Sequence, residues 1–280
     1  MGFLKLLTAF FGLFGKDRSP AALLNLTVPR SGYRRMRNIA YGNGPRQRMD
    51  VYMPLNAPAS APMLLFFYGG AFRCGRKEEY PIVGQAFASK GIVVAVADYR
   101  IHPEGRFPDF LEDGALAVAA MHARAAEWGG DPDRIFVAGH SAGAYLAVML
   151  AANPAYLRAA GADPAWIRGV IALAGRYHEL PLGDATALEI FRGPARDETR
   201  PGTYIDGKRP PILLASGAND HASVLESLRR LAARLREHGS EAEEIVYPGT
   251  GHMGIMLALA PGFRGRAAVR DDIARFIAKR

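Results

Sequence analysis

The chain has 280 residues, of which 49% are hydrophobic and 22% are charged, and its formal net charge is +8. This length and composition indicate a globular chain with a large core, and no low-complexity linker or repeat divides it. The arginines are scattered instead of clustered with aromatic residues, so we expect no nucleic-acid partner and only weak attraction to anionic surfaces.

The chain contains a single cysteine, Cys74. An intramolecular disulfide is therefore excluded, and no Cys/His cluster has the spacing of zinc ligands. We expect neither a metal nor an organic cofactor.

Residues 1–38 are expected to form a lead-in segment with an apolar run from Leu6 to Gly15. This run is shorter than the roughly 20 residues that cross a bilayer. Two interpretations stay open. Residues 1–15 form a helix that packs on the domain or makes weak contact with a membrane surface, and the protein is cytoplasmic or peripheral to the inner membrane. Alternatively, the run is the apolar core of a signal peptide and the protein is exported to the periplasm, although no convincing cleavage site follows.

Strand-like and helix-like segments alternate along the rest of the chain, and residues 39–280 are expected to form one domain. Strands are predicted at 48–54, 61–70, 92–100, 134–139, 167–175, 210–217 and 242–247. Helices are predicted at 78–91, 107–130, 142–152, 184–191, 224–238 and 263–280, with a turn at 131–134. Apolar strands separated by helices predict a mostly parallel, doubly wound α/β sheet with helices on both faces. Ligands of such sheets bind at the carboxyl ends of the strands.

Ser141 lies where a buried strand meets a helix, in the segment Gly-His-Ser-Ala-Gly that spans residues 139–143. A strand-to-helix turn this tight strains the backbone at the serine, and the small residues Gly139 and Gly143 avoid clashes on either side. The alternative is a glycine-rich packing turn with a solvent-exposed serine. Because the helix N-terminus favours developing negative charge, the context indicates a nucleophile.

A serine hydroxyl needs a base, and the base needs an acid that fixes its tautomer. His252 follows the predicted strand 242–247, and Asp220 follows the strand 210–217, so both are expected at the same edge as Ser141. His140 is next to the serine, but at such a turn its side chain should project away from the hydroxyl. Asp220 has an alternative role as the N-cap of the following helix.

The pair Gly69-Gly70 follows another buried strand. Paired glycines allow backbone N–H groups to face a site without obstruction by side chains. We expect a donor from this pair and the N–H of Ala142 to form an oxyanion hole.

With these pieces in place, the chain resembles the serine carboxylesterases of the α/β-hydrolase superfamily, from about Ile39 to the C-terminus. The resemblance is carried by "YGGAF", "DYRIHPEGRFPDFLEDG", "GGDPDRIFVAGHSAG", "GAND" and "GTGH". The chain is similar to the branch that includes hormone-sensitive-lipase-like bacterial esterases, and to relatives such as isoprenylcysteine methylesterases and kynurenine formamidases, towards which His140 points. Two positions depart from that branch, because Tyr68 replaces a histidine and His140 replaces an aspartate. The resemblance also implies that Asp113 is a structural acid.

These observations predict a serine hydrolase that cleaves small or short-acyl carboxylic esters through an acyl-enzyme. The segment 177–209 is too short for a large lid domain, which weakly favours small soluble substrates. The same residues would also serve an arylformamidase or amidase, and a non-catalytic ligand-binding protein on the same scaffold is a third interpretation. The expected partner is a small-molecule ester or formamide, and the oligomeric state stays open.

Overall fold

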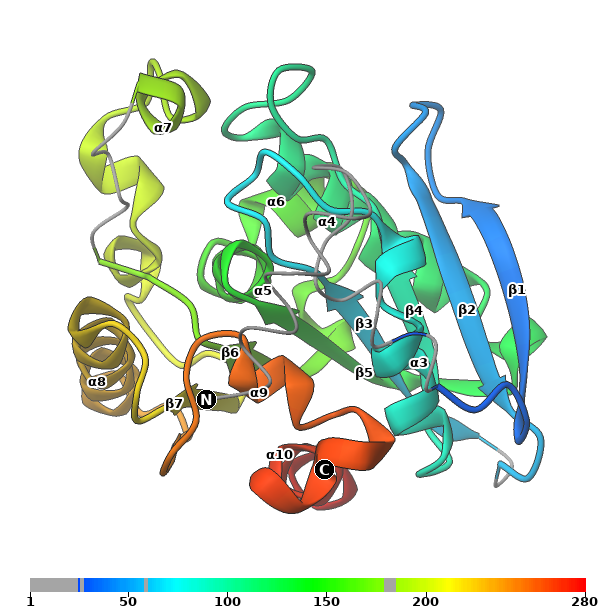
Figure 1. Cartoon of the computed structure of the whole chain (residues 1–280). Coiled ribbons are helices and arrows are strands. Elements are labelled where there is room, and N and C mark those ends of the chain that lie inside the picture. The colour runs from blue at the N-terminus through cyan, green and yellow to red at the C-terminus, as the bar shows by residue number, and fades with distance from the viewer. Residues whose placement is uncertain (1–24, 26–27, 58–59, 179–184) are drawn as a thin grey trace.

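The computed structural model of the chain describes residues 25, 28–57, 60–178 and 185–280. The apolar run at residues 6–15, with its two interpretations, lies outside the described residues. Eight strands form one sheet in the order β1-β2-β4-β3-β5-β6-β7-β8 (Figure 1). The strands are β1 (Tyr33–Ala40), β2 (Arg48–Pro54), β3 (Ala61–Phe67), β4 (Val93–Ala97), β5 (Gly130–His140), β6 (Ile167–Leu173), β7 (Ile212–Gly217) and β8 (Ala242–Tyr247).

The neighbouring strands β4-β3-β5-β6-β7-β8 run parallel to one another. Strand β2 pairs antiparallel with both β1 and β4. All five residues of β4 and all six of β7 are buried, as expected for strands covered on both faces. The predicted α/β-hydrolase fold, with its mostly parallel sheet, is therefore confirmed.

Helices cover both faces of this sheet. They are α3 (Pro81–Ala88), α4 (Asp109–Ala123), α5 (Ala142–Ala152), α6 (Ala155–Ala159), α7 (Ala185–Ile190), α8 (Ala222–Glu237), α9 (Gly254–Leu257) and α10 (Val269–Ala278). Helix α5 packs against β3, β5 and β6 and every one of its residues is buried, which explains its uniformly apolar sequence. Helices α4 and α6 contact each other, and α3 contacts α10 (Figure 1). None of the described helices combines the length and the apolar character that a bilayer crossing requires.

The turn predicted at 131–134 is wrong, because these residues belong to β5. The pairing of β5 with β3 shifts between the partners Ala61–Gly130 and Met63–Ile135, so the polar residues form an irregularity inside the strand. Asp131 accepts a hydrogen bond from the backbone N–H of Asp133 at 3.0 Å. The local chemistry of a turn is therefore present, but the strand continues through it.

The sheet also begins earlier than predicted. β1 is an edge strand that pairs with β2 and spans the expected boundary between residues 38 and 39. Its sequence is rich in arginine and only partly buried, so it lacks the apolar run that marked the inner strands.

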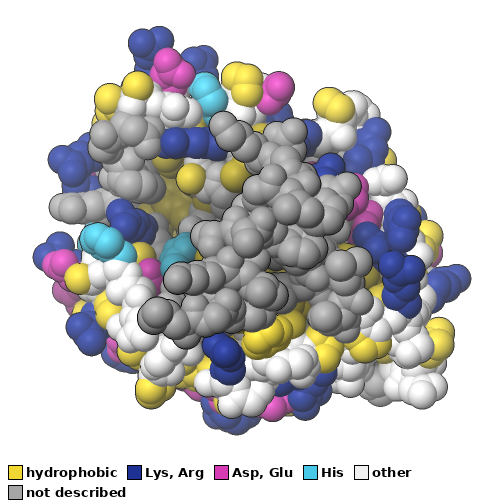
Figure 2. Space-filling model, viewed as in Figure 1, with side chains coloured by type: hydrophobic (Ala, Val, Ile, Leu, Met, Phe, Trp, Pro, Cys, Tyr) yellow, Lys and Arg dark blue, Asp and Glu magenta, His cyan; other side chains and the backbone are white. Residues whose placement is uncertain are grey.

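Figure 2 shows that Lys and Arg side chains are spread around this face of the molecule and interspersed with Asp and Glu.

Candidate active site

Ser141 connects β5 to α5 in a strained backbone conformation, with φ 54° and ψ −115°. Its N–H donates to the carbonyl oxygen of Leu173, at the end of the neighbouring strand β6, over 2.8 Å. A Cβ on Gly139 would lie 2.1 Å from the carbonyl oxygen of Gly143, and a Cβ on Gly143 would lie 2.0 Å from that of Phe67. Both glycines are therefore required for the sharp turn that carries the serine.

Asp220 and His252 are in direct contact. Nδ1 of His252 lies 3.0 Å from Oδ2 and 3.2 Å from Oδ1 of the Asp220 carboxylate. The carboxylate also accepts from the hydroxyl of Ser216 at 2.9 Å and from the backbone N–H of His221 at 2.7 Å. Burial favours the neutral acid, but the hydrogen bonds from His252 and His221 outweigh burial and lower the pKa of Asp220. The aspartate therefore stays ionised and orients the imidazole.

The N-cap alternative for Asp220 is wrong. His221 occupies the N-cap position of α8, and its ring accepts a hydrogen bond from the backbone N–H of Ser223 at 3.3 Å. The side chain of Asp220 is only 3% exposed, whereas that of His252 is 38% exposed. The carboxylate is thus buried, whereas the imidazole that it contacts is partly exposed to solvent.

Ser141 and His252 line one cavity of about 500 Å³. Its apolar lining is contributed by Ala71, Phe72, Ala142, Tyr145, Ala174, Ala187, Ile190, Phe191 and Val224. Its polar lining is contributed by Arg73, Ser141, Arg176, Asn219, Asp220, His221 and His252. An apolar cavity with a few convergent polar groups is the usual form of a small-molecule site.

The Gly69-Gly70 pair passes close to the serine, because a Cβ on Gly69 would lie 3.0 Å from the Cβ of Ser141. Gly70 has φ +132°, and a Cβ there would lie 2.1 Å from the carbonyl oxygen of Cys74. Neither N–H of this pair donates to another residue in the described part of the chain. The N–H of Ala142, in the first turn of α5, has no acceptor within the helix. Among the described residues, these three N–H groups near the serine therefore have no acceptor.

Tyr68, which replaces the histidine of the related branch, turns away from the cavity and is fully buried. Its hydroxyl donates to Oδ1 of Asp98 at 2.7 Å and accepts from Nη2 of Arg46 at 2.7 Å. Its ring stacks on Tyr80 and Tyr99, with centroids 5.3 and 4.9 Å away. The hydroxyl of Tyr99 donates to the carbonyl oxygen of Tyr68 at 2.7 Å. This network holds the residue that directly precedes the glycine pair. No local sequence pattern pointed to Arg46 or Asp98.

His140 is buried against the loop that carries His252. Its Nε2 lies 3.0 Å from the backbone carbonyl oxygen of His252, and the two rings are 4.8 Å apart between centroids. Burial, together with the neighbouring His252, lowers the pKa of His140 to about 4. The ring is therefore neutral at pH 7, and the carbonyl acceptor requires the proton on Nε2. The sequence placed this side chain away from the hydroxyl but did not identify its contact.

Asp113 is fully buried within the fold and does not line the cavity. Its carboxylate accepts from the backbone N–H of Arg100 and from Nε2 of Gln47, both at 2.7 Å. These contacts fix the segment after β4, which is a structural task.

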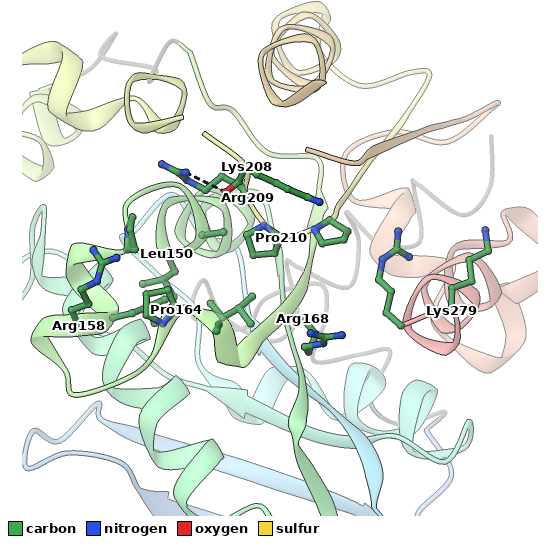
Figure 3. A pocket seen from close by; sticks show the side chains of 15 residues that line it. Leu150, Arg158, Pro164, Arg168, Lys208, Arg209, Pro210 and Lys279 are labelled. Carbon is green, nitrogen blue, oxygen red and sulfur yellow. Dashed lines mark hydrogen bonds between the residues drawn. The ribbon is translucent and has the colours of Figure 1, made fainter. Parts of the chain in front are cut away.

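A second cavity, of about 620 Å³, lies at the opposite, amino ends of β6 and β7 (Figure 3). Arg158, Arg168 and Lys208 line it together with prolines such as Pro164 and Pro210. None of Ser141, Asp220 and His252 reaches it. The reactive side chains are therefore confined to the first cavity.

Comparisons with known proteins give consistent results. The BD-FAE family model matches residues 49–158. An isoprenylcysteine alpha-carbonyl methylesterase of Arabidopsis thaliana is 30% identical over 263 residues, which cover 86% of this chain and 61% of the relative. A probable methylesterase of the same kind and organism is 30% identical over 244 residues, which cover 79% of this chain and 51% of the relative. The chain thus spans about half to three fifths of the length of these relatives.

The crystal structure of EstE1, a thermostable carboxylesterase cloned from a metagenomic library, has a TM-score of 0.70 to this chain. The two sequences are 25% identical, and the alignment covers 92% of each chain.

Proposed function

The chain belongs to the α/β-hydrolase superfamily, and we propose that it is a serine hydrolase that cleaves carboxylic esters of small size. The observation that carries this proposal is the buried, ionised Asp220 in contact with His252, whose ring lines the same cavity as Ser141. An imidazole held by a carboxylate and a serine on a strained turn are the parts that acyl transfer requires.

In the proposed first step, Oγ of Ser141 attacks the ester carbonyl carbon while Nε2 of His252 takes the hydroxyl proton. The carbonyl π electrons move onto oxygen, and the resulting oxyanion accepts hydrogen bonds from the N–H of Ala142 and from the Gly69-Gly70 pair. Asp220 stabilises the imidazolium without taking its proton.

Collapse of this intermediate breaks the bond between the carbonyl carbon and the alcohol oxygen. His252 returns its proton to the departing alkoxide, and the acyl group remains on Ser141. Water then attacks the acyl-enzyme with His252 as the base. The second collapse releases the carboxylic acid and restores the serine hydroxyl. Besides the ester and one water molecule, these steps use only the groups named above.

The cavity supports a substrate of small size. A volume of about 500 Å³, with Phe72, Tyr145 and Phe191 in its lining, accommodates a short acyl or aryl group. The aromatic side chains pack against each other, with Phe72 and Phe191 centroids 5.8 Å apart. This packing supports a preference for short chains.

The test is a panel of 4-nitrophenyl esters from acetate to decanoate, assayed with the wild type and Ser141→Ala. Loss of a serine nucleophile lowers kcat by about 10⁴-fold or more, with the fold intact by circular dichroism. N-formylkynurenine, added to the panel, distinguishes an esterase from an arylformamidase. A wild type that is neither labelled by a fluorophosphonate nor active on any substrate would show that the scaffold only binds ligands.

A further inference from the structure

Two arginines line the active-site cavity on opposite sides of the serine. Arg73 follows the glycine pair after β3, and Arg176 follows β6. Since β5 lies between β3 and β6 in the sheet, Ser141 at the end of β5 is flanked by both cations. The cavity that holds the serine is therefore lined by two permanently ionised side chains.

Among the described residues that line this cavity, no carboxylate is available to pair with Arg176. Asp220 is the one carboxylate among the described lining residues, and its side chain is 3% exposed. Its oxygens already accept from His252, Ser216 and His221. The charge of Asp220 is thus committed to orienting the imidazole.

Arg176 is half-buried, and its side chain makes no hydrogen bond or ion pair with another residue in the described ranges. A guanidinium stays ionised at every physiological pH and offers up to five donors. The same cavity is lined mainly by apolar groups, among them Ala174 and Val224. A partly desolvated cation without an anion is an incomplete interaction, which a ligand anion would complete.

We propose that the preferred substrates are esters that carry a second, anionic group, and that Arg176 is the specificity-determining residue that binds it. This proposal rests on the proposed esterase function. A carboxylate is the smallest such group and pairs with a guanidinium through two hydrogen bonds. The substrate class is therefore a half-ester of a short dicarboxylic acid or an acylated hydroxy acid, depending on which side of the carbonyl faces Arg176.

Two matched substrate pairs test the two sides. Ethyl hydrogen succinate and ethyl butyrate differ by a carboxylate in place of a methyl group on the acyl side, and their hydrolysis is followed by pH-stat titration. 4-Acetoxybenzoate and phenyl acetate differ by a carboxylate on the leaving-group side. For each pair, the selectivity is the ratio of kcat/KM for the anionic ester to that for the neutral ester.

We expect Arg176→Gln to lower this selectivity about tenfold for one of the two pairs, since it removes one charge-assisted ion pair. The loss should fall mainly on KM, because the anion is bound equally in the ground and transition states. Arg176→Lys should retain part of the selectivity, and added salt should weaken it in the wild type. The matched control is Arg168→Gln, an exposed arginine of the other cavity (Figure 3), which should leave both rate and selectivity as in the wild type.

Equal selectivity in the wild type and Arg176→Gln for both pairs would overturn the anionic-substrate proposal and leave the esterase assignment standing. If the wild type cleaves none of the four esters, the esterase assignment itself fails.

Discussion

Nε2 of His140 lies 3.0 Å from the backbone carbonyl oxygen of His252, so the residue before the serine holds the loop that carries the proposed base. The ring also lies close to Gly69, because a Cβ on that glycine would lie 3.0 Å from Nδ1 of the imidazole. One buried ring thus lies between the strand-to-helix turn, the glycine pair and the loop that carries the proposed base.

This relationship predicts that His140→Leu impairs turnover without removing any group that touches the substrate. The carbonyl of His252 would lose its donor, and a buried polar group without a partner costs about 1–3 kcal/mol. We expect a lower kcat on a neutral ester and a smaller loss for His140→Asn, whose amide can still donate. Steady-state kinetics of the three proteins would test this, and wild-type kcat in His140→Leu would argue against a positioning role.

The same residue predicts how stability depends on pH. The pKa of His140 is about 4 in the folded protein, below the ordinary value of 6.5, so the unfolded chain binds more protons between these values. Stability from this group is fully present above pH 6.5 and is lost as the pH falls towards 4, at about 1.4 kcal/mol per pH unit. Urea unfolding at pH 7 and pH 5 should show a drop about 2 kcal/mol larger in the wild type than in His140→Leu. An equal drop in the two proteins would contradict the depressed pKa.

The buried tyrosine network predicts that Tyr68→Phe destabilises the protein. The variant keeps the stacked ring but loses the hydroxyl contacts to Asp98 and Arg46, which costs about 1–3 kcal/mol. kcat should also fall, by less than the roughly 100-fold loss that follows removal of an oxyanion donor. Tyr247→Phe, which removes a hydroxyl bonded to Asp272 at the edge strand β8, is the control and should leave kcat unchanged. If Tyr68→Phe and Tyr247→Phe changed kcat equally, the Tyr68 network would have no specific role in positioning the site.

The sequence predicted the elements that bury apolar runs, because burial on both faces leaves a continuous local signal. Strand β8 begins and ends at the predicted residues, and so does α5. Strand β1 was missed because an edge strand with one solvent-exposed face needs no apolar run, and four of its eight residues are Arg or Asn. The bulged start of β5 was read as a turn because its polar residues do make a local turn contact.

The site, too, could be predicted only where its residues carry a local sequence signal. Ser141, Asp220 and His252 were identified because each follows a strand, and parallel strands end at one edge. The support for these residues was not visible, because it depends on pairs far apart in the chain. Arg46 and Asp98 both bind the hydroxyl of Tyr68 and lie 3.9 Å from each other, and His140 contacts a carbonyl 112 residues away. No local pattern encodes such contacts.

The carboxylate of Asp220 predicts that removing the acid that orients His252 lowers kcat, whereas removing an exposed carboxylate elsewhere does not. Asp220→Asn keeps the shape but presents an amide to Nδ1 of His252, which favours the wrong tautomer, so kcat should fall by roughly 10⁴-fold. Asp206→Asn, which alters an 85% exposed carboxylate paired with Arg209, is the control and should be neutral. Kinetics on 4-nitrophenyl acetate would decide, and a tenfold loss or less in Asp220→Asn would exclude the aspartate as the orienting acid.

The oxyanion segment gives the last prediction. In Gly70→Ala the new methyl group would lie 2.1 Å from the carbonyl oxygen of Cys74, so the backbone must shift and its N–H groups must move with it. Loss of one aligned donor lowers kcat by about 10²–10³-fold. Gly129→Ala is the matched control, because Gly129 also has positive φ but nothing lies within 4 Å of its added Cβ. The control therefore carries the strain of an alanine in the left-handed region, about 1 kcal/mol, without the collision. If both variants lose stability to a similar extent and both keep wild-type kcat, the glycine pair only forms a turn, and the oxyanion must be bound by other donors.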